Sequence, residues 1–363
     1  MSQNLLPNIA THPGTVLKDE LTERGIKQKD FAFEISMQPT MLNEILKGKR
    51  PVTADVSILL EKALDISADF WMNFQTQYEI DLARIKERNI QKVQNLDYWK
   101  VIKQYVPIKF FRKEGILSDD IVKDIDSIKQ IYKSNSIDDI VNDFAKHKSV
   151  AYFRKSEKLQ VDEVNVFGWS KLVSWIAEKE TVSKFDPEEF ELLKTKLHKV
   201  FYDNIDVRSK TRKALSEHGI KLVFLNKFEK TPIDGYSFWS SKNPAIGLTL
   251  RHKRIDNFAF TVFHELGHIY KHLEVDKTIE FIDLENKDNP TKNKHEDEAD
   301  EFAQTNLISE NQMKELESLM PFNDQVVIDF ADKHGINPAI IIGRMCWEMD
   351  YYAIKTSINK QLN

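Results

Sequence analysis

Residues 258–272 read FAFTVFHELGHIYKH and place His264, Glu265 and His268 within five positions of one another. The residues around them make this helix-like stretch apolar on nearly every side: Phe260, Val262, Phe263, Leu266 and Ile269. Buried histidines need polar partners, and a metal ion supplies them. The alternative, a helix whose histidines face solvent, fits these apolar surroundings poorly.

The spacing of the two histidines indicates a metal site. Residues four apart lie on one face of a helix, so His264 and His268 can bind one zinc ion while Glu265 lies beside it as a general base. Zinc makes a bound water acidic enough to attack a peptide carbonyl. His272 continues the spacing, but a helix places it ~12 Å from His264, too far to share the ion.

A third ligand is expected in residues 294–309, KHEDEADEFAQTNLIS, where Glu296 and Asp300 lie one helical turn apart. Glu296 would bind zinc, and Asp300 would accept the second N–H of a ligand histidine. Glu298 and His295 are alternatives to Glu296. Taken alone, the segment is equally consistent with a solvated acidic face.

Three blocks of this region resemble the ImmA/IrrE family of zinc endopeptidases: RIDNFAFTVFHELGHIYKH, EDEADEFAQTNLIS and GINPAIIIGRM. The resemblance covers roughly residues 220–345. It implies an α+β, zincin-like metallopeptidase domain that uses Zn²⁺, and well-known members of the family cleave a helix-turn-helix repressor. LIS stands where LMP or LIP is more usual, a departure that leaves the ligand positions untouched.

The same resemblance assigns roles to individual residues. It implies that His264, His268 and Glu296 are zinc ligands and that Glu265 is the catalytic base. Asp300 stands where the family usually has Asn or Asp, in the outer shell of the metal site.

Residues 12–83 resemble the HigA-type antitoxins of the XRE helix-turn-helix family. The HPG start, the GKR after the third helix and the FWMNFQ ending occur in the order typical of that family. In such modules the third helix enters the major groove of DNA. The resemblance implies that Gln28 would contact the DNA backbone and that Gln38, Thr40 and Asn43 would face base edges. The residues expected to neutralise phosphates are Lys47, Lys49 and Arg50.

Two positions of this segment depart from the family pattern. Ser36 stands where the turn usually has glycine, and Glu44 stands where a basic residue is common. Residues 1–70 carry 8 Lys+Arg against 10 Asp+Glu, so the segment is not generally basic. We therefore expect DNA binding of modest affinity that depends on a homodimer, with a module that binds only protein as the alternative.

The whole sequence of 363 residues predicts a multidomain protein. We expect an all-α helix-turn-helix domain at 1–83, a helical connector at 84–218 and an α+β peptidase domain at 219–363. The net charge of −5 gives no chain-wide basic signature, and the single Cys346 excludes an intramolecular disulfide. No signal peptide or membrane span is visible, so we expect a cytoplasmic protein without a membrane partner.

The sequence thus predicts a DNA-binding transcriptional regulator with a zinc-dependent endopeptidase domain, whose activity is latent or regulated. Its partners would be operator DNA and a protein substrate, either a repressor or a toxin–antitoxin component. A non-proteolytic repressor or antitoxin that only holds a partner is the alternative. Residues 235–250 read as a hairpin, which would either offer an edge strand to a substrate peptide or lie in the core.

Overall fold

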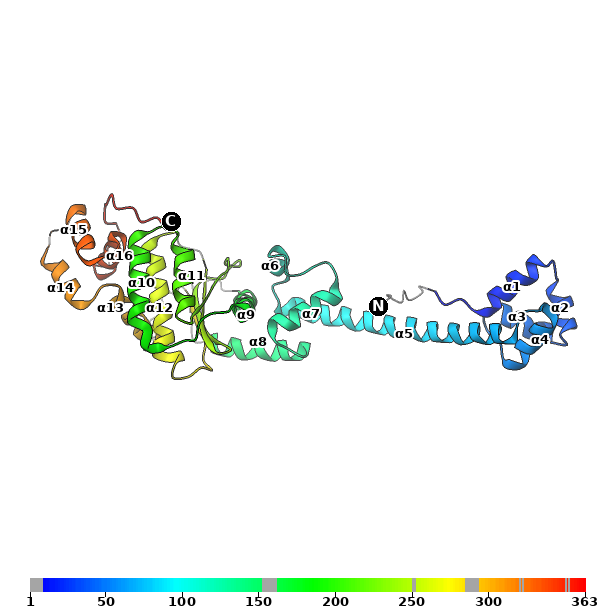
Figure 1. The fold of residues 1–363 in the computed structure, drawn as a ribbon. Helices are drawn as coiled ribbons and strands as arrows, with labels where there is room; N and C mark the ends of the chain where they lie inside the picture. The colour runs from blue at the N-terminus through cyan, green and yellow to red at the C-terminus, as the bar shows by residue number, and fades with distance from the viewer. Residues whose placement is uncertain are drawn as a thin grey trace. The chain divides into compact units, whose positions relative to one another are not determined.

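The computed structural model describes residues 9–151, 162–249, 253–284, 294–319, 321, 323–349, 351 and 353–363. The chain forms two compact units, Met1–Tyr98 and Trp99–Asn363 (Figure 1). The first unit is all-α, and the second contains helices with a small mixed sheet, as the sequence predicts. The finer division into three domains at 83 and 218 stays a prediction.

The first unit begins with four short helices: α1 (Pro13–Glu23), α2 (Gln28–Glu34), α3 (Pro39–Leu46) and α4 (Ala54–Leu64). Local signals set their starts, because α1 and α3 each begin with proline and the Thr53 side chain caps α4. Their apolar faces meet in one core that includes Leu17, Phe31 and Ile45. Ser36, in the turn between α2 and α3, has φ of 53°, a conformation that favours glycine.

Helix α5 (Ala68–Tyr105) is much longer than the predicted helix-turn-helix domain allows. Its first turns contribute Trp71 to the core of the first unit. The helix then continues past residue 83 through a charged stretch, and the boundary between the two units falls within it.

Helices also make up the first part of the second unit: α6 (Ile108–Lys113), α7 (Ile121–Tyr132), α8 (Ile137–Ala151), α9 (Glu163–Lys179), the 3₁₀ turn η2 (Pro187–Glu189), α10 (Phe190–Asp203) and α11 (Val207–Glu217). Together with the sheet they form two apolar clusters, one on each face of the strands. Ala245 belongs to the cluster of Trp169 in α9, whereas the next residue, Ile246, belongs to the cluster of Val262. This alternation is the period-two pattern of a strand buried on both faces.

The sheet has four strands: β1 (Lys221–Phe224), β2 (Ile233–Ser240), β3 (Asn243–Leu248) and β4 (Phe281–Leu284). Their order is β1-β3-β2-β4, with β1 parallel to β3 and the other pairs antiparallel. The predicted hairpin is therefore present as β2 and β3, but both strands are internal. The expectation that residues 235–250 offer an edge strand to a peptide is wrong, because β1 and β4 already cover their outer sides.

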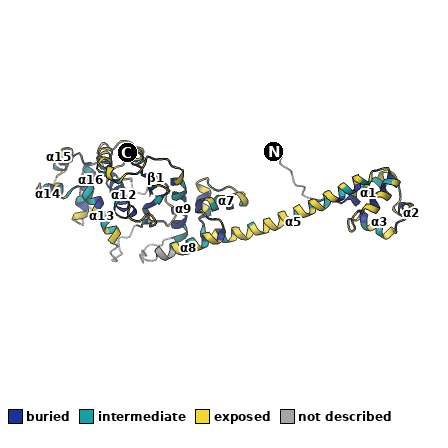
Figure 2. Ribbon diagram, turned by 60° about the horizontal axis from the view of Figure 1, so that its bottom comes forward, coloured by how far each residue is buried: buried dark blue, intermediate teal, exposed yellow. Residues whose placement is uncertain are grey.

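The remaining elements carry the metal-site motif and the C-terminal helices: α12 (Ile255–His268), the π-helical turn η3 (Ile269–Leu273), α13 (Lys294–Leu307), α14 (Glu310–Ser318), α15 (Asp324–His334) and α16 (Pro338–Glu348). Helix α12 lies against the sheet and is buried along most of its length (Figure 2). Arg254 is its N-cap residue, and the Asp256 carboxylate pairs with the Arg254 guanidinium. No helix in the described part of the chain is long and apolar enough to span a bilayer.

Candidate metal centre

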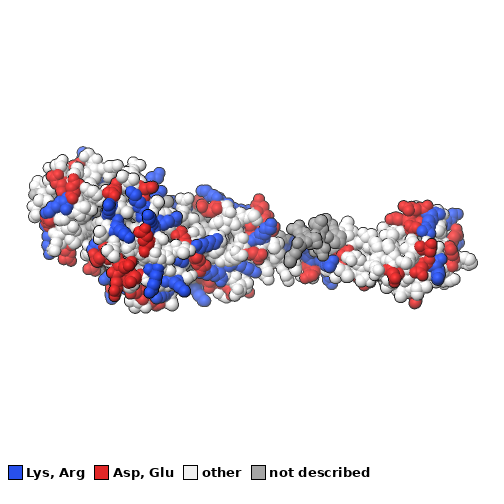
Figure 3. Space-filling model, viewed as in Figure 1, with Lys and Arg blue, Asp and Glu red and all other residues white. Residues whose placement is uncertain are grey.

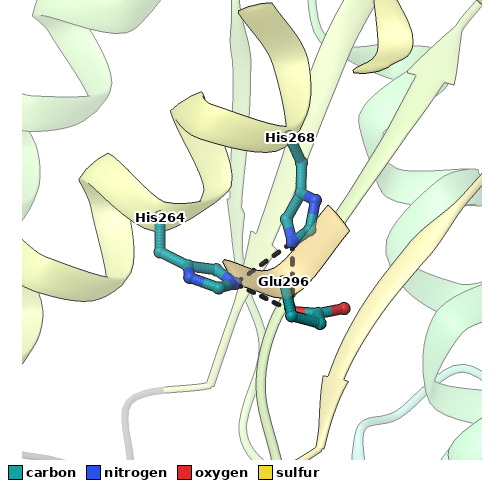
Figure 4. A group of neighbouring side chains, drawn as sticks. All are labelled: His264, His268 and Glu296. Carbon is teal, nitrogen blue, oxygen red and sulfur yellow. Dashed lines mark hydrogen bonds and ion pairs between the residues drawn. The ribbon is translucent and has the colours of Figure 1, made fainter. Parts of the chain in front are cut away.

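The last turn of α12 carries His264 and His268, both of which are buried. Their Nε2 atoms lie 3.1 Å apart and point toward one place beside the helix (Figure 4). The four-residue spacing thus brings the two rings together as expected.

Helix α13 packs directly on α12 at a position where both helices have small residues. A Cβ atom added to Gly267 would lie 2.9 Å from the Ala299 Cα and 3.1 Å from the Ala299 carbonyl oxygen. This close approach places the Glu296 carboxylate next to both rings. One of its oxygens lies 3.2 Å from Nε2 of His264 and 3.4 Å from Nε2 of His268 (Figure 4).

The geometry of these three ligand atoms fits a tetrahedral zinc ion. Ligand atoms ~2.0–2.2 Å from such an ion lie roughly 3.3–3.5 Å from one another. The separations here are 3.1, 3.2 and 3.4 Å, and each atom comes from a type of side chain that binds zinc. The residues that are present therefore fit the metal ion that the family resemblance implies.

Asp300, one turn after Glu296 on α13, holds the other side of the His264 ring. Its Oδ1 lies 2.8 Å from Nδ1 of His264, the contact expected of an outer-shell partner. Burial by itself would lower the pKa of His264, but its contacts with Asp300 and Glu296 raise that pKa well above the usual value. The two carboxylates thus favour a positive charge at the position of the His264 ring. Burial lowers the pKa of His268 to about 4, so this ring is neutral, as a metal ligand must be.

Glu265 lies completely buried between α12 and the sheet. Its carboxylate accepts a hydrogen bond from the Ser237 hydroxyl of β2, while its other oxygen has no hydrogen-bond partner among the described residues. Burial raises the pKa of Glu265 to about 8. Gly235 makes room for the side chain, since a Cβ at that position would lie 1.8 Å from Oε1 of Glu265.

His272 lies on the far side of His268, in the π-helical turn. Its Nδ1 is 3.3 Å from Nδ1 of His268, and its Nε2 is 2.9 Å from Oε2 of Glu298. His272 therefore lies outside the group formed by His264, His268 and Glu296. Glu298 contacts Nε2 of His272, and the ring of His295 lies edge-on against the ring of His272. Neither Glu298 nor His295 therefore replaces Glu296 in the cluster.

Strand β4 adds an acidic residue that the sequence did not predict at this site. Asp283 of β4 groups with His264 and Glu265, with ligand atoms within 4.8 Å of one another. Asp283 and Asp300 also line a cavity of about 330 Å³ beside the cluster, together with Phe260 and Trp347. Asp283 belongs to no local motif, and only the pairing of β4 with β2 brings it to the site.

The seven residues predicted to contact DNA all belong to the first unit and are exposed: Gln28, Gln38, Thr40, Asn43, Lys47, Lys49 and Arg50. They lie at the start of α2, along α3 and in the loop that follows α3. Glu44 pairs with Arg50 at 2.9 Å, which offsets part of the basic charge. Acidic and basic side chains lie side by side on the visible face of this unit (Figure 3).

Two family models match separate segments of the chain. Residues 17–71 match the model described as "Helix-turn-helix", and residues 215–336 match the model described as "IrrE N-terminal-like domain". The second segment includes the cluster of His264, His268 and Glu296.

Relatives with assigned names match about a fifth of the chain. Virulence-associated protein I of Dichelobacter nodosus is 32% identical over 82 residues, which is 22% of this chain and 76% of that protein. The uncharacterized HTH-type transcriptional regulator YddM of Escherichia coli is 26% identical over 74 residues, 20% of this chain and 79% of that protein.

Among solved structures, antitoxin HigA of Pseudomonas aeruginosa with the higBA promoter is 34% identical and has a TM-score of 0.21, over 23% of this chain and 91% of that one. An addiction module antidote protein of the HigA family from Coxiella burnetii is 29% identical with a TM-score of 0.21, over 23% and 92% of the two chains.

Proposed function

We propose that this chain is a DNA-binding regulator with a zinc-dependent endopeptidase domain, because residues 17–71 match a helix-turn-helix family model and residues 215–336 match an IrrE-like peptidase family model. One observation carries the enzymatic part of the proposal. His264, His268 and Glu296 converge with the separations of a tetrahedral site, and Glu265 lies beside them in the HELGH motif.

In the proposed reaction, His264, His268 and Glu296 hold the metal, and Asp300 keeps the His264 ring oriented. A bound zinc ion supplies a Lewis acid for the substrate carbonyl and makes a water acidic enough to attack at neutral pH. Glu265 takes the proton of the attacking water and later gives it to the leaving amine.

The proposed partners follow from the two halves of the chain. A protein substrate, either a partner repressor or a toxin–antitoxin protein, would lie with one side chain in the 330 Å³ cavity beside the cluster. Operator DNA would bind α3 of a homodimer, and the name of the Escherichia coli relative, a transcriptional regulator, supports this role. We place the protein in the cytoplasm, where both partners would be found.

A second candidate function is a non-proteolytic repressor or antitoxin whose metal site only holds a partner or senses a signal. The burial of Glu265 favours it: the side chain is 0% exposed, and its carboxylate is held by Ser237. A peptidase built this way would need a movement around β2 before Glu265 could act, which agrees with a latent or regulated activity.

The first experiment measures the zinc content of the purified protein beside that of Glu296→Ala. We expect about one zinc per wild-type chain and little in the variant, because two histidines alone leave the site half built. Glu265→Gln is the matched control, since it changes a neighbouring carboxylate but removes no ligand, and it should retain the metal. A wild type that takes up no zinc when zinc is supplied would end the peptidase proposal.

The catalytic step is tested by comparing protein N-termini, by mass spectrometry, in cells that express either the wild type or Glu265→Gln. New N-termini should appear with the wild type alone, because the variant binds zinc but lacks the base. If a biological effect, such as repression of a promoter, persists in Glu265→Gln, the non-proteolytic function is favoured.

A further inference from the structure

The middle of α5 carries an apolar stripe that is open to solvent. Leu82, Val93 and Leu96 are 43%, 59% and 44% exposed, and Ile90, beside the stripe, is 50% exposed. The exposed residues continue along much of this helix (Figure 2). An isolated helix in water is marginally stable, and most helices in proteins are held by packing of an apolar face. The stripe therefore predicts a packing partner.

The spacing of the stripe is that of a helix–helix seam. Leu82, Ile85, Asn89, Val93 and Leu96 follow one another at intervals of 3, 4, 4 and 3 residues, which keeps all five on one face. Leu82 and Ile85 recur as Val93 and Leu96 eleven residues later, a repeat typical of nearly straight or slightly right-handed helix pairs. Asn89 stands in the middle of the seam, where one buried Asn commonly fixes register and the number of helices.

Charged residues flank the seam in a self-complementary order. Asp81 precedes the first apolar pair and Lys86 follows it, whereas Lys92 precedes the second pair and Asp97 follows it. In a parallel pair of helices, the residue before a seam pair meets the residue five positions later on the other helix. Asp81 would then meet Lys86 of a second copy, and Lys92 would meet Asp97 of that copy.

We propose that residues 81–97 of α5 form a parallel, in-register coiled coil with the same segment of a second copy of this chain, with Asn89 facing Asn89. Two ion pairs of the kind just described form on each side of the seam. An antiparallel pair with the same apolar layers would place Arg88 beside Arg88 of the second copy and Glu79 near Asp97 of that copy. Both contacts join like charges and are repulsive.

This inference rests on the DNA-binding part of the proposed function, because the coiled coil would supply the dimer that binds DNA. Dimers of helix-turn-helix proteins read two half-sites, so a dimer seam directly after the helix-turn-helix would pair two α3 helices. The seam itself is tested without DNA and without zinc. Its failure is therefore distinguishable from failure of DNA binding or of proteolysis.

Sedimentation equilibrium of the full-length chain tests the seam, with wild type beside Val93→Asp. We expect a concentration-dependent dimer for the wild type and a dissociation constant raised more than about tenfold in the variant, since a carboxylate would be buried in the seam. Ile80→Asp is the matched control, because Ile80 is 40% exposed on another face of the same helix and should leave the dimer intact. A wild type that stays monomeric, or equal losses in the two variants, would overturn the proposal.

The direction of the helices is tested with Leu82→Cys under mild oxidation. A parallel, in-register pair places the two introduced thiols together and gives a cross-linked dimer, whereas an antiparallel pair keeps them apart. The native Cys346 is buried, so the unchanged chain should not cross-link. The charge exchange Asp81→Lys with Lys86→Asp should preserve the dimer, and Lys86→Asp alone should weaken it. A dimer that never cross-links through position 82 would contradict the parallel arrangement.

Discussion

At the scale of single residues, the candidate metal site combines a local motif with positions that no local pattern reveals. His264 and His268 are readable from the sequence because a helix fixes the geometry of residues four apart. Gly235 and Ser237, which give Glu265 its room and its hydrogen bond, come from a strand about thirty residues earlier. Their contact with Glu265 depends on how β2 lies under α12, and sequence spacing carries no information on that packing.

Glu298 offers a test of how the second histidine is positioned. Nε2 of His268 points at the ligand cluster, so we assign the proton to its Nδ1, which donates to Nδ1 of His272; Nε2 of His272 then donates to Glu298. The Glu298 carboxylate thus fixes both rings from outside the cluster. Glu298→Ala should weaken zinc binding about tenfold, at the low end for outer-shell partners.

A competition titration with a chromophoric zinc chelator measures this effect, independently of any proteolysis. Glu301→Ala is the control, because Glu301 is an exposed glutamate of the same helix, whereas the carboxylate that contacts His272 is that of Glu298. Equal zinc affinities in the two variants would remove Glu298 from the site.

At the scale of elements, the sequence predicted those helices whose ends are marked by local signals. Pro13, Pro39 and Thr53 lie at the starts of α1, α3 and α4, in the segment that the sequence predicts to be an all-α domain. The length of α5 and the order of the strands were not predictable in this way. The charged stretch after residue 83 has no stop signal before Pro107, and the strand order comes from pairings between segments distant in the sequence, such as β2 with β4.

Helix α3 is the element on which the proposed DNA binding depends. Substitutions in this helix and in the loop that follows it should affect DNA binding in two different ways. Lys49→Ala should weaken binding to all DNA sequences alike, because it removes a phosphate contact. It should also reduce the slope of the logarithm of the binding constant against the logarithm of the salt concentration by about one. Asn43→Ala should relax the preference at one base pair, at a cost of ~1–3 kcal/mol for the preferred sequence.

Selection of bound duplexes from a random DNA pool, followed by binding measurements at several salt concentrations, separates the two effects. Lys62→Ala, a change on α4 away from the predicted contacts, should alter neither property. If the chain selects no sequence and binds DNA no better than Lys49→Ala does, the helix-turn-helix serves protein binding instead.

At the scale of the whole molecule, the two units have separate hydrophobic cores. The core of the first unit is built from residues 17–71, and the two clusters of the second unit are built from residues 99–346. Each unit should therefore unfold cooperatively by itself, so that heating gives two transitions. The proposed metal site lies in the second unit only, whereas the proposed coiled coil stabilises the first.

Removal of zinc should consequently lower one transition and leave the other unchanged. A ligand present at a hundred times its dissociation constant stabilises the folded state by ~2.7 kcal/mol. For a unit of this size each kcal/mol corresponds to roughly 2–4 °C, so a chelator should lower the transition of the second unit by about 5–10 °C. Differential scanning calorimetry measures both transitions, and raising the protein concentration should shift only that of the first unit, because dimers gain stability with concentration. In His264→Ala the chelator should have no effect, and a chelator that lowered both transitions of the wild type would show that the metal also stabilises the helix-turn-helix unit.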